Sequence, residues 1–524
     1  MSRFEIMAPA GSFECLVAAV EGGADSVYFG VGHLNMRSRS ASNFTAEDLP
    51  EVCRICRAYG IKSYLTLNIT LFDGEISEAR KLLDSALEVG VDAVIASDMA
   101  VISYARSIGL EVHISTQLSI SNLESLRFYS QFADVVVLAR ELTLPQVREI
   151  GEAIRREGIR GPGGELVRIE MFAHGALCMA VSGKCYLSLS EYGASANRGA
   201  CFQVCRHAYE VSDAETGEKL LIDNEYIMSP KDLCTVEFLD KMAEAGVRVF
   251  KIEGRARNAE YVRTCASCYR RAADAVEAGT FTPELAASLK AELSGVFNRG
   301  FWDGYYQGAR LGEWSSVYGS QSTRHRVYCG RITNWFSRIG VAEVLVESEP
   351  LSLGDEVIIT GPTTGVISFT VTDLRADTPP SPSPLGAPAG SAIASPLAAP
   401  AVPASPSASP LGAPAGSAAT PAGRASRRGA HASLPTTVAP KGVRCSVAVP
   451  LTGLPADRIS GGALAASAVA PPAVRTPGGA LAPSAAVPPA VRTPGCSLAP
   501  SASTGAEEPL HPRRGDRLYI MRGV

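Results

Sequence analysis

Short apolar runs alternate with amphipathic segments of helix length from residue 4 to about residue 254. The runs are rich in β-branched residues, whereas the segments between most of them repeat Leu, Ala, Glu and Arg at helical spacing. The pattern predicts eight strands, at 4–11, 26–30, 62–68, 93–98, 111–117, 134–141, 168–175 and 249–254. Eight strands separated by helical crossovers favour an α/β fold with a parallel (β/α) barrel of TIM type, predicted here over 1–310. A doubly wound open sheet is the alternative, because the order of elements does not show closure.

The pattern changes after residue 320 to short strands joined by turns, which predicts a small C-terminal β-barrel over 320–375. Two stretches that follow, 376–440 and 451–512, are rich in Ala, Pro and Ser and contain internal repeats such as SPLGAPAGSA. They lack aromatic residues and apolar periodicity, so we predict that they are disordered insertions. Residues 441–450 and 513–524 again resemble strands, and we expect them to continue the β-barrel.

Composition and charge narrow the function classes. The net charge of −4 and the pI near 6.1 exclude a uniformly basic surface, so RNA binding would require a local basic patch. The chain shows neither a secretory signal nor an apolar run long enough to span a membrane. Thirteen cysteines without an export signal indicate a reducing compartment. We therefore expect a cytoplasmic protein with no membrane and no DNA partner.

Cysteines gather after the seventh predicted strand, at Cys178, Cys185, Cys201 and Cys205, and Cys234 follows. Such a group predicts thiolates that hold an iron–sulfur cluster or another metal centre. Structural zinc usually takes two close cysteine pairs, so the wide spacing from Cys178 to Cys185 favours a cluster. The remaining candidates are predicted to be buried thiols that pack as small apolar groups: Cys15, Cys53, Cys56, Cys265, Cys268 and Cys329.

Polar residues follow the predicted strands at the ends that would form the functional face of a barrel. The candidate catalytic residues are Glu170, His174, Lys251, Glu253 and Arg255, and Arg140 is the candidate for binding a small anionic ligand. Lys251, Glu253 and Arg255 alternate along one strand and so share a face. The alternative to a catalytic role for these three residues is an internal ion pair of Glu253 with Lys251 or Arg255. For each arginine, the alternative is an ion pair at the protein surface.

The run EMFAHGALCMAVSGKCYLS (170–188) resembles the signature of the peptidase U32 family, and the resemblance extends through most of residues 5–310, including KIEGR at 251–255. The resemblance implies hydroxylases that act on transfer RNA, ribosomal RNA or a ubiquinone precursor. It implies a [4Fe–4S] cluster, with ligands at Cys178, Cys185, Cys201 and Cys234 in the ubiquinone branch. Some transfer-RNA members match Cys205 but not Cys234, so the fourth ligand stays open between these two.

The transfer-RNA branch implies oxygen-independent 5-hydroxylation of uridine 34, with tRNA as the partner and prephenate as the hydroxyl donor. Hydroxylation of rRNA or of a non-RNA substrate is an alternative, and so is a non-catalytic RNA-binding protein stabilised by a metal. An older label for the family is collagenase-like peptidase. The sequence contains neither an HExxH zinc site nor a GxSxG nucleophile motif, although a Cys178–His174 pair could serve as a nucleophile.

Overall fold

A computed structural model describes residues 4–39, 41–210, 212–217, 226–309, 311–377, 433–450 and 510–524. Most of the two stretches predicted to be disordered, 376–440 and 451–512, lies outside the described residues. Within the described ranges, no helix is both long and apolar enough to cross a membrane.

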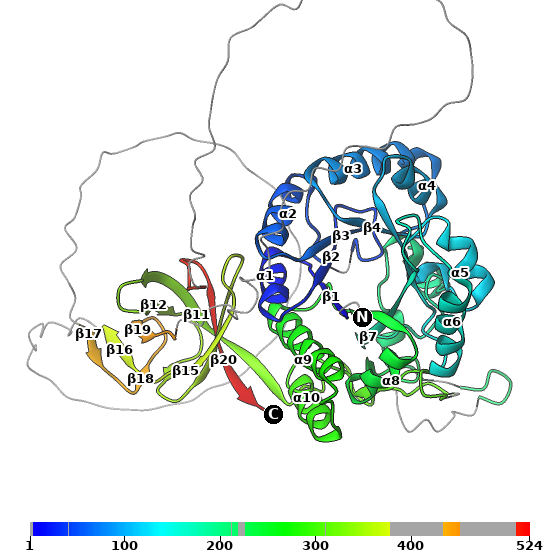
Figure 1. The fold of residues 1–524 in the computed structure, drawn as a ribbon. Helices are drawn as coiled ribbons and strands as arrows, with labels where there is room; N and C mark the ends of the chain where they lie inside the picture. The colour runs from blue at the N-terminus through cyan, green and yellow to red at the C-terminus, as the bar shows by residue number, and fades with distance from the viewer. Residues whose placement is uncertain are drawn as a thin grey trace, which may run out of the picture.

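Eight parallel strands close into a barrel in the order β1-β2-β3-β4-β5-β6-β7-β9, with β9 hydrogen-bonded back to β1 (Figure 1). The pairing of β7 with β9 closes the ring, which confirms the predicted barrel over an open sheet. The barrel strands are β1 Glu5–Pro9, β2 Ser26–Gly30, β3 Lys62–Leu67, β4 Ala93–Ala96, β5 Glu111–Ile114, β6 Val135–Val137, β7 Arg168–Gly175 and β9 Val247–Ile252.

Helices surround the barrel, as Figure 1 shows. Several begin at a polar cap whose side-chain oxygen accepts a backbone N–H of the first turn, as at Ser12, Asp98, Asn122 and Asn258. The α-helices are α1 Phe13–Glu21, α2 Leu49–Ala58, α3 Ile76–Val89, α4 Met99–Ser107, α5 Leu123–Ser130, α6 Leu144–Glu157, α7 Leu187–Tyr192, α8 Leu239–Glu244, α9 Ala259–Ala278 and α10 Pro283–Ser294. Single 3₁₀ turns are η1 Ala46–Asp48, η2 Asp73–Glu75, η3 Thr116–Leu118, η4 Ala196–Arg198, η5 Val204–Arg206 and η6 Val236–Phe238.

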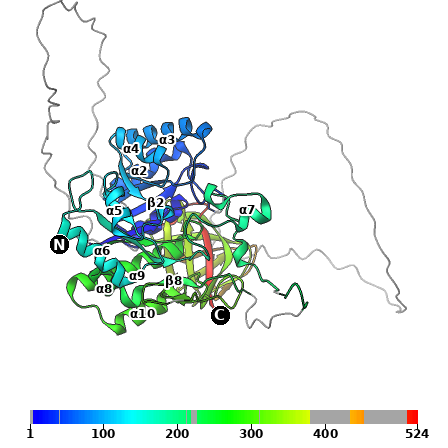
Figure 2. The ribbon, with the colours of Figure 1, turned by 90° about the vertical axis from the view of Figure 1, so that its right-hand side faces the viewer.

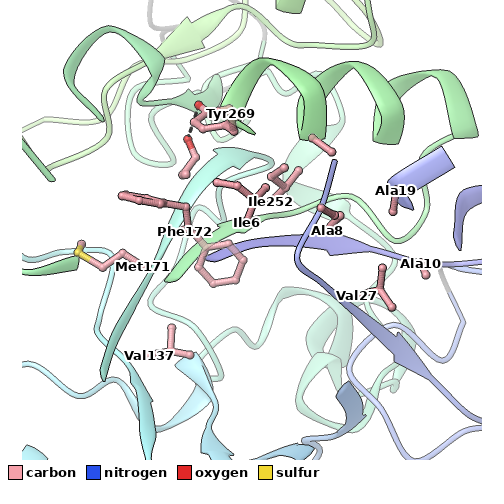
Figure 3. Close-up of a cluster of buried hydrophobic side chains, with 14 of the residues drawn as sticks. Ile6, Ala8, Ala10, Ala19, Val27, Val137, Met171, Phe172, Ile252 and Tyr269 are labelled. Carbon is pink, nitrogen blue, oxygen red and sulfur yellow. Dashed lines mark hydrogen bonds between the residues drawn. The ribbon is translucent and has the colours of Figure 1, made fainter. Parts of the chain in front are cut away.

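Alternation along the strands divides the core into two parts. Side chains such as Ile6, Val27 and Ile252 belong to the large cluster that joins the strands to the helices (Figure 3). The residues between them point into the barrel, where a separate apolar cluster includes Met7, Tyr28, Tyr64, Ala93, Ile95, Val135 and Val249. His113 and Glu170 are also fully buried and polar.

Two short strands extend the sheet beyond the barrel. β8 (Asp232–Cys234) pairs antiparallel with the end of β7, and β10 (Phe301–Trp302) pairs with β8. The connection from β7 to β8 begins at the C-terminal end of the barrel, and it includes α7, which lies at one end of the barrel in Figure 2. This connection carries four of the five candidate cysteine ligands.

The C-terminal strands form an eight-stranded sheet around a core of their own, in the order β15-β14-β20-β11-β12-β19-β16-β17. The region predicted to be a small β-barrel forms this sheet, and β19 and β20 from beyond the Ala/Pro-rich stretches are part of it. Among the described residues, the end strands β15 and β17 are not paired with each other. The strands are β11 Arg324–Phe336, β12 Val341–Val346, β14 Glu356–Gly361, β15 Gly365–Thr370, β16 Leu374–Asp377, β17 Ser433–Pro435, β19 Arg444–Ala448 and β20 Arg517–Gly523, with β13 Leu351–Ser352 paired to β18 Val438–Ala439.

The prediction that 376–440 is disordered is wrong at both ends of this stretch. Residues 376–377 belong to β16, and β17 and β18 lie within 433–439. Backbone pairing of β16 with β17 orders these short segments, although their composition resembles that of the neighbouring stretch.

Candidate functional site

A cavity of about 190 Å³ opens at the C-terminal ends of the barrel strands. This cavity, called here the upper cavity, is the place where a (β/α) barrel carries its chemistry. Eight of the predicted site residues line it: Arg140, Cys178, Cys185, Cys201, Cys205, Lys251, Glu253 and Arg255. Glu170, His174 and Cys234 are not among its lining residues.

Glycines hold the cysteine-bearing connection close to the barrel rim. A Cβ at Gly199 would lie 2.2 Å from Ser38 Oγ, and one at Gly183 would lie 2.7 Å from Gln117 Oε1. Both glycines have positive φ, a conformation that other residues rarely adopt. Arg140 fixes the same connection from below, since it donates to Ser182 Oγ at 2.7 Å.

Four thiols therefore line the upper cavity. Arg140 Nη2 lies 3.7 Å from Cys178 Sγ. Burial raises the pKa of the Cys205 thiol, while the neighbouring Arg206 lowers it. Cys178, Cys185 and Cys201 are close enough to Cys205 to act on its pKa electrostatically.

Cys234 lies in different surroundings, on β8 and away from the cavity lining. It is buried beside the Tyr269 hydroxyl, at 3.9 Å, and burial raises its pKa to about 11. The structure thus brings Cys205 to the other three thiols and separates Cys234 from them. The thiols predicted to be packing residues, including Cys53 and Cys56 on α2, are all buried, which confirms that prediction.

The donor set at the cavity fits an iron–sulfur cluster by ligand type and number, because such clusters take four thiolates. The positive charges described below would also stabilise the deprotonated thiols. Within the described ranges, no group of three or more His, Cys, Asp or Glu side chains is already arranged around a single metal position.

Two ion pairs organise the charges on the floor of the cavity. Lys251 Nζ contacts Glu170 Oε1 at 2.7 Å, and Arg37 Nη2 contacts Glu253 Oε1 at 2.7 Å. Burial alone would raise the pKa of Glu253, but the charges of Arg37 and Arg255 lower it to about 2. The alternative considered above, pairing of Glu253 with Lys251 or Arg255, is not what the structure shows. The actual partner, Arg37, comes from the loop after β2, and no local pattern links it to Glu253.

Arg255 is buried and donates from Nη1 to Thr66 Oγ1 at 2.8 Å. Burial lowers its pKa to about 10. In the part of the chain that the structure describes, no carboxylate lies within 4.0 Å of the guanidinium. The same holds for three other arginines that line the cavity: Arg140, Arg206 and Arg257. The cavity therefore carries positive charge that carboxylates do not neutralise. Sequence reasoning missed Arg206 and Arg257, although each lies within two residues of a predicted site residue.

His174 lies outside the upper cavity. It is buried, its Nδ1 is 3.4 Å from the Tyr269 hydroxyl, and it packs against Tyr261 and Phe301. Burial and the charge of Arg257 lower the pKa of His174 to about 3, so the ring is neutral at pH 7. A register irregularity in β7 between Phe172 and His174 separates their directions, because Phe172 lines the cavity and His174 does not. The Cys178–His174 pair considered as a nucleophile is therefore not formed.

Comparison with known proteins identifies relatives along most of the chain. The model for Peptidase family U32 matches residues 11–316. A protein named collagenase from Porphyromonas gingivalis is 60% identical over 375 residues, covering 72% of this chain and 91% of that protein. The tRNA hydroxylation protein P1 of Bacillus subtilis is 32% identical over 366 residues, covering 68% and 83%. The 23S rRNA 5-hydroxycytidine C2501 synthase of Escherichia coli is 35% identical over 318 residues, covering 59% and 46%.

Proposed function

This chain belongs to peptidase family U32, and on that premise we propose that it is an RNA hydroxylase whose substrate is tRNA. Relatives named for hydroxylation of tRNA and of rRNA support the reaction class. The finer proposal is 5-hydroxylation of uridine 34 without molecular oxygen. The observation that carries it is the upper cavity, where four thiols and an excess of arginines face one space at the functional end of the barrel.

Cys178, Cys185, Cys201 and Cys205 would hold a [4Fe–4S] cluster in this proposal. Such a cluster, when bound, supplies electron transfer or Lewis-acid chemistry beside the substrate. Arg140 keeps the cysteine-bearing connection in place through Ser182 and the Ala176 carbonyl oxygen. Arg37 and Glu253 form an ion pair, so together they fix the shape of the cavity floor without adding net charge.

The hydroxyl donor is proposed to be a small dicarboxylate, prephenate by family resemblance. Arg255 and Arg257 are available for its carboxylates, since both line the cavity and neither has a carboxylate partner among the residues that the structure describes. A planar guanidinium binds a carboxylate through two parallel hydrogen bonds, which a lysine cannot do. The buried position of Arg255 strengthens such a contact, because little water competes there.

Exposed aromatic side chains on the cysteine-bearing connection support contact with RNA. Tyr186, Tyr192 and Phe202 are 69%, 55% and 44% exposed, and the rings of Tyr192 and Phe202 lie 5.0 Å apart. The exposed Lys184 on the same connection adds positive charge. Unpaired bases stack on such rings, and basic side chains bind the phosphates, so this surface suits a single-stranded RNA loop.

Peptidase activity is the competing function, because a relative at 60% identity is named collagenase. The cavity argues against a cysteine peptidase of the usual kind. A cysteine nucleophile needs an adjacent base, and among the residues that the structure describes no histidine lines the upper cavity.

The test measures modified nucleosides in a strain that lacks the gene. Mass spectrometry of total tRNA and rRNA should show loss of 5-hydroxyuridine derivatives from tRNA, with recovery on complementation by the wild-type gene. The Cys178→Ser gene should not restore them, while Cys53→Ser should. Unchanged tRNA and rRNA nucleosides, together with gelatin cleavage by the purified protein, would refute the proposal.

A further inference from the structure

A line of buried titratable side chains runs down the interior of the barrel below the upper cavity. Lys251 lines the cavity and contacts Glu170 at 2.7 Å. Glu170 Oε2 faces His113 Nδ1 at 3.9 Å, and His113 Nε2 lies 3.1 Å from Glu111 Oε1. Glu111 lines a second cavity, of about 550 Å³, into which the first residues of β5 and β7 point; we call it the lower cavity.

The spacing of these residues follows from strand geometry. Glu111 and His113 are two residues apart on β5, and Arg168 and Glu170 are two apart on β7, so each pair points into the barrel. His113 and Glu170 are fully buried among the apolar residues of the interior cluster. Polar groups in such a place are costly unless they are paired or used.

The contact between His113 and Glu170 is the informative one. His113 Nδ1 and Glu170 Oε2 are both buried, and neither has a hydrogen-bond partner within the described part of the chain. When His113 donates Nε2–H to Glu111, its Nδ1 presents a lone pair to an oxygen of Glu170. Two acceptors then face each other at 3.9 Å, and only an added proton between them makes the contact favourable. A small rotation of either side chain would bring the atoms within hydrogen-bonding distance.

We propose that Lys251, Glu170, His113 and Glu111 form a proton-transfer path between the upper and the lower cavity. Lys251 gives a proton to the Glu170 carboxylate, which becomes a neutral carboxyl group, and the Lys251 amine takes a proton from the upper cavity. The Glu170 proton then passes from Oε2 to His113 Nδ1 while the Nε2 proton passes to Glu111. The N–H bond at Lys251, the O–H bond at Glu170 and the N–H bond at Nε2 break, and new bonds form at Glu170, at Nδ1 and at the Glu111 carboxylate. No electrons move. One proton leaves toward the lower cavity in this direction, and the reverse transfer, which returns one proton to the upper cavity, restores the first tautomer of the ring.

The surroundings of His113 allow this role. The Tyr64 ring lies 4.5 Å from the imidazole and limits its rotation, and the Tyr64 hydroxyl donates to Glu5 rather than to the path. Burial would raise the pKa of Glu111, but His113 and Arg168 lower it overall, so Glu111 is ionised and its oxygen can accept the hydrogen bond of Nε2–H. Its side chain is 35% exposed, which connects the path to solvent.

The path would matter most when the upper cavity is covered. This part of the inference rests on the proposed function, in which an RNA molecule lies over the mouth. Protons released or consumed beneath the RNA cannot then exchange freely with solvent at that end. A route through the barrel floor keeps the site connected to the opposite face.

The test replaces His113 by Gln, which can keep the hydrogen bond to Glu111 but cannot relay a proton. In single-turnover hydroxylation of saturating RNA, we expect the rate to fall by at least about tenfold, since general acid–base catalysis contributes about 10²–10⁴. The rate of the variant should rise with pH, while iron content and melting temperature stay near wild type. Glu111→Gln, at the partly exposed end, should slow the reaction in the same direction. Tyr64→Phe is the matched control, because it removes a buried hydrogen bond at the same depth without cutting the path.

Selective ¹⁵N labelling of the seven histidines gives a readout that does not depend on hydroxylation. The Nδ1 and Nε2 shifts of His113 should change in Lys251→Gln and in Glu111→Gln, and remain unchanged in Tyr64→Phe. Wild-type rate and pH profile in a folded His113→Gln protein would overturn the path. If the wild-type protein hydroxylates no RNA, the proposed function fails. In that case the path is tested by NMR alone, and it is overturned if the His113 Nδ1 and Nε2 shifts are the same in Lys251→Gln and Glu111→Gln as in wild type.

Discussion

Cys205 and Cys234 show how the surroundings of a side chain decide its chemistry. Both follow the run at residues 170–188, and both could complete a set of four thiolates. Cys205 lines the upper cavity, and the three other thiols are close enough to affect its pKa electrostatically. Cys234 is buried beside Tyr269, and burial raises its pKa to about 11. Cys234 therefore lies away from the cavity that the other four thiols line.

If the proposed [4Fe–4S] assignment holds, Cys205→Ser should lose most of the bound iron and Cys234→Ser should retain it. The reason is that only Cys205 lies at the cavity with Cys178, Cys185 and Cys201. Iron and sulfide analysis of anaerobically purified protein measures this, with Cys53→Ser as the control for a buried thiol. Retention of iron by Cys205→Ser and its loss from Cys234→Ser would reverse the assignment.

Arg255→Lys tests the donor site, because lysine keeps the charge but loses the forked geometry of the guanidinium. We expect hydroxylation to fall by at least about tenfold, since one buried charge-assisted hydrogen bond contributes about 1.5–3 kcal/mol. Melting temperature and iron content should stay close to wild type. Arg54→Lys, on the exposed surface of α2, is the control. A melting temperature that falls in step with activity would show that Arg255 is structural.

At the scale of elements, the side chains of β7 point into the barrel along most of the strand and away from it at His174. Arg168, Glu170 and Phe172 alternate into the barrel, from the lower cavity to the upper one. The register irregularity after Phe172 then moves His174 out of this series. The strand ends by pairing with both β8 and β9, which positions the cysteine-bearing connection. A period of two residues predicts the first part of this arrangement but not the irregularity.

The contact of α1 with β15 joins the barrel to the β domain, and Glu21 is its titratable group. Its carboxylate accepts the Val366 N–H at 3.1 Å, and Arg263 donates to the Val366 carbonyl oxygen. Burial raises the pKa of Glu21 from 4.5 to about 8. The folded protein thus keeps a proton that the unfolded chain releases at lower pH. The stability that this proton provides is complete below about pH 4.5 and is lost as the pH rises to about 8.

We therefore expect the urea midpoint of wild-type protein to fall between pH 4.5 and pH 8 by more than that of Glu21→Gln. The amide cannot titrate, so the difference between the two proteins isolates this group. Equilibrium unfolding at several pH values measures it. Glu14→Gln, also on α1, is the matched control. Equal pH dependence of wild type and Glu21→Gln would contradict the role of Glu21.

At the scale of the whole molecule, the β domain depends on strands that are far apart in the sequence. β20 lies between β14 and β11, so the last residues of the printed chain form an interior strand of the sheet. β19 pairs with β12 and β16 after a long intervening stretch. The domain is thus complete only when segments from both sides of the Ala/Pro-rich stretches come together.

Deletions test this organisation. Removal of 515–524 should lower the melting temperature strongly, since it divides the sheet between β14 and β11 and exposes two strand edges. Removal of 378–432, which lies outside the described residues, should change it little, because a longer loop costs little more to close. Removal through residue 440 should cost more, since it also deletes β17 and β18. Thermal unfolding measures all three, and equal losses from all of them would contradict this arrangement.

The sequence by itself determined a parallel α/β fold, because eight apolar runs with helices between them can bury their side chains only in a parallel sheet with covered faces. The closure of that sheet into a barrel was decided by the pairing of β9 with both β1 and β7. The sequence also placed Arg140, Lys251, Glu253 and Arg255 at one rim, since strand ends in such a barrel converge. Tertiary structure alone decided which groups touch. Arg37 reaches Glu253 across 216 residues, Cys205 joins the thiols that Cys234 does not, and His113 aligns with Glu170 inside the barrel. Local periodicity gives the direction of a side chain along its own strand, but contacts between distant segments depend on how the whole chain closes.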